Sequence, residues 1–247
     1  GLPDAAVREA RERITAALQN TGLVPPRHRT IVNLAPAHVR KEGSQYDLPI
    51  ALGFLAATGQ LLARLDGYLF VGALDLDGAL RAVPGVFAVA EHARSAGVGT
   101  LVVPPGNARE AAAAGVPVIA PSTLKEILDH LEERSALAVV VRASSAAPAA
   151  QEADVPDMAA IAEQASAKRA LEIAASGGHN VLLHGSPGSG KSLLAKAIVG
   201  ILPELSEPEA LEVTKIWSIR RLLPEGGDVV RPRPYRAPHH SVSAVAL

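Results

Sequence analysis

The stretch from Asn180 to Leu194 restricts the possible folds more than any other part of the chain, because it joins three patterns in one order. The apolar or nearly apolar run Val181 to His184 predicts a buried strand. A glycine-rich turn comes next, and a segment rich in alanine and leucine then predicts a helix. Together they match the P-loop pattern G-x-x-x-x-G-K-[ST] in its strand, loop and helix context. The positions of the pattern are Gly185, Ser186, Pro187, Gly188, Ser189, Gly190, Lys191 and Ser192.

The chemistry of this pattern is phosphate binding. Glycines let backbone N–H groups turn inward, and the positive end of the helix dipole completes an anion-binding nest. Lys191 is expected to reach the β- and γ-phosphates, and the Ser192 hydroxyl to ligate the Mg²⁺ that bridges them. We therefore predict ATP and Mg²⁺ as ligands of residues 185–192. The alternative is a glycine-rich turn that only joins a strand to a helix.

Composition limits the class of protein. With 247 residues the chain has room for two domains, and its formal net charge of −1 indicates no global attraction to nucleic acid or membrane. The absence of cysteine excludes disulfides and fits a reducing cytoplasm. The longest apolar candidate, Leu48 to Leu65, is interrupted by polar residues and glycines, so it predicts a core helix and no membrane span.

The first part of the chain, residues 1–134, is predicted to be an α/β domain with a mixed sheet. Amphipathic spacing and helix signals predict helices over 4–19, 48–63, 86–96, 107–114 and 124–134. Short β-type runs predict strands over 30–34, 68–74, 79–83, 100–103 and 116–120, with 68–74 and 79–83 forming a hairpin. Thr123 and Glu126 suit a capping box at the start of the last helix.

Residues 135–156 are rich in Ala, Ser, Pro and Val and predict a linker, after a possible short strand at 138–141. The second domain is expected over residues 157–247. It begins with a helix over 158–175, continues into the P-loop, and contains a further helix from Ser206 to about Leu223. A turn-rich, basic tail follows.

Several further stretches resemble the magnesium-chelatase-like AAA+ ATPases of the ComM/YifB type across nearly the whole length. These stretches are G-L-P-D-A-A-V-R-E-A-R-E-R, V-N-L-A-P, K-E-G-S-Q-Y-D-L-P-I-A-L-G, A-K-R-A-L-E-I-A-A-S-G-G-H-N, L-S-E-P-E-A-L-E-V-T-K-I and R-P-Y-R-A-P-H-H-S. The resemblance implies a Lon-protease-like N-terminal domain of the ribosomal S5 domain 2 type, followed by the first part of an AAA+ motor. It also implies an ATP-driven hexameric ring in the bacterial cytoplasm that remodels branched DNA in recombination or natural transformation. The sequence then looks truncated at both ends.

A Lon-like domain raises the question of peptidase activity. When the Lon motif K-D-G-P-S-A-G is laid over Lys41 to Asp47, Gln45 stands where the nucleophilic serine belongs, and Ser44 is one residue away. In the best register, Phe87 stands at the position of the lysine that partners this serine in Lon. Since a serine hydroxyl needs an adjacent base to become a useful nucleophile, we expect a non-catalytic domain.

Other residues allow functional interpretations as well as plain ones. Gln164 lies in the segment that usually covers the adenine in this family, whose preceding glycine is Glu163 here. The residues Lys168 and Arg169 could face a phosphate or could form a solvated helix surface. From Lys215 onward a basic excess could meet DNA, a neighbour's nucleotide or only solvent. The pair His239-His240 is not spaced for a metal site.

The family's second acidic motif, sensors and arginine finger have no counterpart here, so no catalytic residue is assigned. We expect this sequence by itself to bind ATP weakly and to hydrolyse it poorly or not at all, and the full-length protein to be an ATPase. Three alternatives to a DNA motor remain: the ATPase subunit of a metal chelatase, an ATP-dependent Lon-like peptidase, and a binding module that uses ATP only to fix its oligomeric state.

Overall fold

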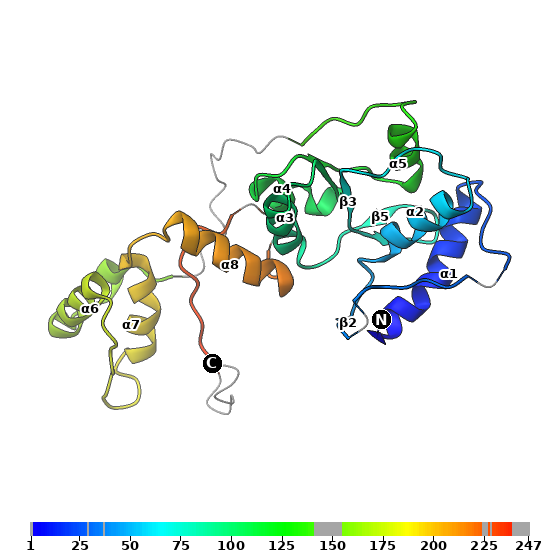
Figure 1. Ribbon diagram of the computed structural model, residues 1–247. Helices are drawn as coiled ribbons and strands as arrows, with labels where there is room; N and C mark the ends of the chain where they lie inside the picture. Colours follow the sequence, from blue (N-terminus) through cyan, green and yellow to red (C-terminus); the bar gives the residue numbers. More distant parts are fainter. Residues whose placement is uncertain are drawn as a thin grey trace. The chain divides into compact units, whose positions relative to one another are not determined.

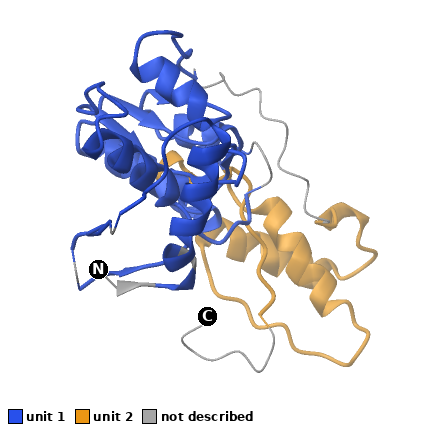
Figure 2. Ribbon diagram, turned by 90° about the vertical axis from the view of Figure 1, so that its right-hand side faces the viewer, with its two compact units in different colours: residues 1–146, 212–229 blue, residues 147–211, 230–247 orange. Residues whose placement is uncertain are grey.

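The computed structural model describes residues 2–28, 30–36, 38–140, 155–223, 227 and 229–238 (Figure 1). These residues form two compact units, one made of 1–146 with 212–229 and the other of 147–211 with 230–247 (Figure 2). Most of the expected linker, residues 141–154, lies outside the described part of the chain. The boundaries expected at 134 and 157 stay predictions.

The first unit is α/β, as expected, but the mixed sheet predicted for it is wrong. The antiparallel hairpin forms a sheet of its own, and the three-stranded sheet of the described residues is parallel throughout. Its strands are β3 (Tyr68–Phe70), β6 (Thr100–Val102) and β7 (Val118–Ile119), in the order β3-β6-β7. Parallel neighbours require a crossover. The helix α3 (Val86–Ser95) supplies it before β6, and η1 (Pro105–Asn107) with α4 (Ala108–Ala113) supplies it before β7. The predicted alternation of strands and helices is confirmed, with shorter elements.

The predicted hairpin is confirmed in shorter form, as an antiparallel pair of β4 (Ala73–Leu74) and β5 (Leu80–Arg81). Residues 68–70, expected in the same strand as β4, belong instead to β3 of the parallel sheet. Gly78 makes the turn with a φ of +85°, a conformation that glycine adopts without strain. The last helix of the alternation is α5 (Leu124–Leu131), and its predicted cap is present, because Thr123 Oγ1 accepts the Glu126 N–H at 3.2 Å. Of the short strand expected at 138–141, the described part makes one bridge, between Val140 and Val118.

Two helices near the N-terminus pack against each other and complete the core of this unit. The first, α1 (Ala5–Asn20), begins at Asp4, whose carboxylate accepts the Val7 N–H at 2.8 Å. The second, α2 (Asp47–Ala57), ends earlier than predicted because Gly59, at φ +71°, turns the chain away. Their apolar faces join one buried cluster, which includes Leu18, Leu48, Leu52, Leu55, Leu74, Val102, Ile119 and Ile127. In the described residues no helix is long and apolar enough to cross a membrane.

The core of this unit contains a charged pair. Asp47 is fully buried, and its two carboxylate oxygens accept from Arg13 Nε at 2.8 Å and Arg13 Nη2 at 2.9 Å. The Asp47 carboxylate also accepts the Leu74 N–H, at 3.4 Å. The hydrogen bonds from Arg13 to the Asp47 carboxylate raise the pKa of Arg13 above its usual value. The forked contact of Arg13 with Asp47 joins α1 to the start of α2. The hydrogen bond from Leu74 joins strand β4 to the same carboxylate.

The strand predicted at residues 30–34 is wrong. These residues form no strand, and the side chains of Ile31 and Val32 are 79% and 51% exposed. The sequence has the composition of a strand, but a strand also needs a neighbour to hydrogen-bond with. Among the described residues the only strand pair near this end of the chain joins β1 (Leu2–Pro3) to β2 (Arg40–Lys41) in parallel.

The second unit is helical in its described part. It contains η2 (Met158–Ala160), α6 (Ala165–Gly177), α7 (Lys191–Ala197), η3 (Ile198–Ile201) and the first turn of α8 (Glu207–Ile219). Its apolar core gathers Met158, Ile161, Leu171, Leu194 and Ala197. At the start of α8, Glu209 accepts from the Ser206 hydroxyl and N–H at 2.7 and 2.8 Å, which lowers the Glu209 pKa.

The single helix predicted over 158–175 is wrong, because the chain breaks between η2 and α6. Glu163 and Gln164 both adopt left-handed backbone conformations, at φ +54° and +58°. Non-glycine residues rarely adopt this region, and two in succession end any regular helix. Ile161, just before the break, is buried in the apolar core of this unit.

The Arg13–Asp47 contact leads to a prediction about stability. Asp47→Asn should lower the free energy of unfolding by about 3 kcal/mol, because it leaves a guanidinium partly buried without its carboxylate. Urea unfolding followed by circular dichroism measures this decrease. Asp75→Asn, which breaks the exposed Asp75–Arg81 pair at 2.7 Å, is the matched control and should change little. Equal midpoints for Asp47→Asn and the unchanged protein would contradict the prediction.

The strained backbone before α6 leads to a second prediction. Glu163→Gly should raise the free energy of unfolding of the second unit by about 0.5–1 kcal/mol, since the relief of left-handed strain exceeds the entropy that glycine adds to the unfolded chain. Ala170→Gly, at an exposed position inside α6, should lower it by about 1 kcal/mol. Thermal unfolding of both variants distinguishes the two effects, and a destabilised Glu163→Gly variant would show that no strain is relieved.

Candidate functional site

The glycine-rich loop lies between α6 and α7. Gly188 and Gly190 both have φ +81°, and Gly190 is the N-cap residue of α7, which begins at Lys191. A side chain at either position would be strained. At Gly185 a Cβ would approach the Ser189 Oγ to 3.2 Å, which is tighter than ordinary packing. The loop residues 185–188 are exposed, so the loop can be approached from solvent. The spacing of the glycines therefore has a direct structural reason.

Lys191 folds over the loop that precedes it. Its Nζ donates to the Gly185 carbonyl at 3.0 Å, to the Ser186 carbonyl at 2.7 Å and to the Ser189 hydroxyl at 3.2 Å. The ammonium thus lies over the loop, where a nest of backbone N–H groups is expected to bind an anion. Ser192, the second residue of α7, is exposed beside it. An exposed loop with left-handed glycines, one cation and one hydroxyl fits a magnesium-bound polyphosphate.

The helix after the loop is anchored in the core of the second unit. Leu194 and Ala197 of α7 are buried, and they belong to the same cluster as Leu171 of α6. The helix predicted from the alanine- and leucine-rich sequence after Lys191 is confirmed. Its packing fixes the helix start and thereby the position of the two residues that the motif assigns to phosphate and metal.

The strand predicted at Val181 to His184 is wrong. None of the four residues is in a strand, and the Leu182 side chain is 92% exposed. Leu183 alone packs against the apolar core of this unit. The described residues of the second unit contain no strand that could pair with this run, and an unpaired β-type sequence does not form a ladder.

Two cations that could have faced a phosphate have partners in the protein. Lys168 Nζ donates to the Ile161 carbonyl, and Arg169 pairs with Glu172 at 2.9 Å. Gln164, expected near the adenine, is exposed at the break before α6. The exposed Arg169 pair favours the solvated-surface interpretation for that residue, whereas Lys168 is partly buried against a backbone carbonyl.

The basic tail is partly neutralised in the same way. Arg233 donates to the Pro203 carbonyl at 2.5 Å and lies 3.6 Å from the Glu209 carboxylate, and Lys215 pairs with Glu91 at 2.6 Å. His239 and His240 lie outside the described residues. In the part of the chain that is described, no group of three or more His, Cys, Asp or Glu could hold a metal ion.

The positions that correspond to a Lon dyad hold no catalytic pair. Gln45 Nε2 donates to the Glu42 carbonyl at 2.5 Å, and Phe87 is 1% exposed within the core. Neither side chain can act as a nucleophile or as a base. The structure therefore adds no support for a peptidase at these positions.

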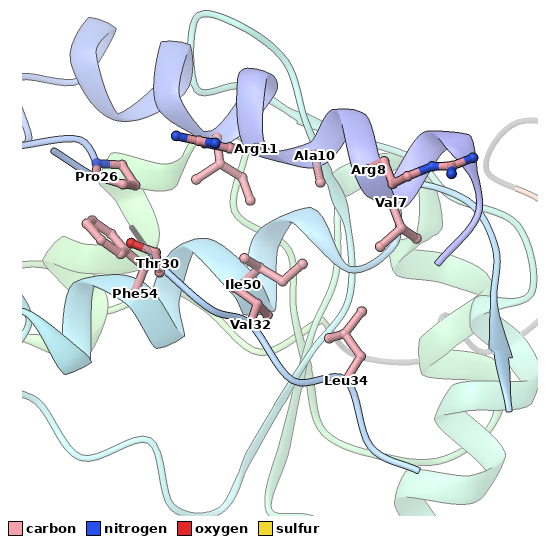
Figure 3. A pocket seen from close by; sticks show the side chains of 11 residues that line it. Val7, Arg8, Ala10, Arg11, Pro26, Thr30, Val32, Leu34, Ile50 and Phe54 are labelled. Carbon is pink, nitrogen blue, oxygen red and sulfur yellow. The ribbon is translucent and has the colours of Figure 1, made fainter. Parts of the chain in front are cut away.

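A pocket in the first unit was not anticipated from the sequence. A pocket of about 260 Å³ opens between α1, α2 and the segment 26–34 (Figure 3). Its walls are mainly apolar, and Arg8 and Arg11 of α1 border it. The signal in the sequence was present but weak: two arginines three residues apart flank the apolar stripe of an amphipathic helix.

Comparison with protein families agrees with this geometry. The model described as "Subunit ChlI of Mg-chelatase" matches residues 1–107, and the model described as "Magnesium chelatase, subunit ChlI" matches residues 157–247. The second match contains the glycine-rich loop, Lys191 and Ser192. The two matches fall on either side of the segment expected to be a linker.

Curated relatives match over the whole chain. YifB of Salmonella typhimurium is 42% identical over 252 residues, covering 100% of this chain and 48% of the relative. Competence protein ComM of Haemophilus influenzae is 39% identical over 251 residues, covering 100% of this chain and 49% of the relative. The chain thus spans about half the length of the curated relatives it matches. The chain belongs to the magnesium-chelatase-like proteins of the ComM/YifB type.

Proposed function

We propose that the chain binds ATP with Mg²⁺ through residues 185–192 and forms part of an AAA+ motor subunit. The observation that carries the proposal is the Lys191 ammonium, held over an exposed loop whose Gly188 and Gly190 are left-handed. In this proposal the loop N–H groups bind the phosphates, Lys191 neutralises the β- and γ-phosphates, and Ser192 ligates the metal. Mg²⁺ held by Ser192 would offset part of the phosphate charge.

The whole protein is proposed to hydrolyse ATP as a hexameric ring and to remodel branched DNA. Support comes from the family and from the name of one relative, Competence protein ComM, which links that relative to competence. The first unit, proposed to be Lon-like, then serves as a non-catalytic accessory. The cysteine-free composition supports a reducing compartment, which we propose to be the cytoplasm.

A second candidate is the ATPase subunit of a metal chelatase. The family descriptions favour it, since both name the ChlI subunit of magnesium chelatase. The two functions share the nucleotide site and differ in what stimulates ATP hydrolysis. Branched DNA would stimulate ATP hydrolysis by a DNA motor, whereas a partner subunit of the chelatase would stimulate ATP hydrolysis by a chelatase subunit. The peptidase alternative has no supporting residue pair.

Removal of the Lys191 ammonium tests the nucleotide site. Lys191→Ala should weaken binding of a fluorescent ATP analogue by about 10- to 100-fold, because a charge-assisted contact to phosphate contributes about 1.5–3 kcal/mol. Lys196→Ala, an exposed lysine in the last turn of α7, is the control and should bind as the unchanged protein does. Circular dichroism checks that both variants are folded. Equal affinity in the two variants would refute the site.

Removal of the Ser192 hydroxyl tests the metal assignment separately. In the unchanged protein, Mg²⁺ should strengthen ATP binding, and EDTA should reverse the gain. Ser192→Ala should lose most of this gain and keep the affinity measured in EDTA, because only the metal ligand is removed. Titrations with and without Mg²⁺ measure the difference. If the variant responded to Mg²⁺ as the unchanged protein does, another residue would hold the metal.

A further inference from the structure

The pocket beside α1 combines an apolar interior with a positive border. Val7 and Ile14 of α1, Ile50 and Phe54 of α2, and Val32 line its interior. Figure 3 shows Phe54 beside Thr30 and Pro26 at one end, and Leu34 toward the other. The interior has room for one flat ring system but is too small for a duplex.

Exposed cations border the pocket. Arg8 and Arg11 are exposed, and within the described residues neither guanidinium makes an ion pair or hydrogen bond. In Figure 3 their side chains extend in opposite directions along α1, that of Arg11 toward Pro26. Arg27, also exposed, directly follows Pro26 in the chain. The positive charges are therefore spread along the pocket and are not gathered at one point.

This distribution favours one kind of ligand. A single carboxylate would meet one guanidinium and leave the others unused, whereas a chain of phosphates presents a negative charge at each repeat. The arginine fork binds phosphate oxygens in pairs. Phe54 offers an aromatic surface on which a base can stack, and such stacking tolerates any sequence. A polyanion that also carries flat, apolar rings matches both the border and the interior.

We propose that single-stranded nucleic acid binds across this pocket, with its phosphates on Arg8 and Arg11 and one base inserted against Phe54. The site lies in the first unit and is separate from the glycine-rich loop. It rests on the proposed function only in that it gives a DNA-directed motor a contact outside the nucleotide site. Binding here requires no ATP.

The test is binding of a fluorescein-labelled oligothymidine to the protein without nucleotide, followed by anisotropy at several salt concentrations. Arg8→Gln with Arg11→Gln should weaken binding at least tenfold and reduce the slope of log K against log salt by about 1.4, or about 0.7 for each phosphate that is no longer neutralised. Phe54→Leu should weaken binding about tenfold and leave the slope unchanged, because a stacked base carries no charge. Arg94→Gln, an exposed arginine on α3, is the matched control and should bind as the unchanged protein does.

Several outcomes would overturn the proposal. One is an unchanged salt slope in the double arginine variant, and another is a decrease in affinity for Arg94→Gln as large as that for the double variant. A third is displacement of the oligonucleotide by polyglutamate at equal or lower concentration, which would assign the pocket to an acidic peptide. Lys191→Ala should bind the oligonucleotide normally. Failure of the nucleotide site and failure of this pocket are therefore separable.

Discussion

The first unit depends on a carboxylate in its core. Asp47 is fully buried at the start of α2, and the contact with Arg13 offsets the desolvation of its charge. Because the same carboxylate accepts the Leu74 N–H, three elements far apart in the sequence are held at one point. The position of α1 against α2 follows from this contact and from the apolar faces around it. The pocket bordered by Arg8 and Arg11 exists because that position is fixed.

In the second unit the corresponding constraint is the backbone of the glycine-rich loop. Two left-handed glycines bring the chain to the start of α7, and buried Leu194 fixes the helix behind it. Lys191 is thereby held against the loop carbonyls and does not extend freely into solvent. The proposed chemistry needs little else from this region, since phosphate binding uses the backbone, one cation and one hydroxyl.

Local patterns were enough to predict the elements that depend on local signals. The helix α1, the hairpin turn at Gly78 and the cap at Thr123 all have signals within a few residues. The strands predicted at 30–34 and 181–184 failed because pairing depends on neighbours that a sequence pattern cannot reveal. The break before α6 was missed because it occurs at Glu163 and Gln164, with no glycine or proline to signal it.

The two candidate sites differ in the same way, since one has a local signal in the sequence and the other does not. The motif that ends at Lys191 and Ser192 is contiguous in sequence, so its position and its glycine geometry could be predicted, whereas the pocket on α1 depends on three segments that come together only in the fold.

The most direct test of the proposed nucleotide site and its function is the rate of ATP hydrolysis by the whole protein, measured with and without forked DNA and repeated with Lys191→Ala. We expect a rate that rises several-fold with forked DNA and falls to background in the variant. Hydrolysis that persists in Lys191→Ala would contradict the assignment of this loop as the nucleotide site. Hydrolysis that disappears in the variant but does not respond to DNA would contradict the DNA-directed function and favour the chelatase type.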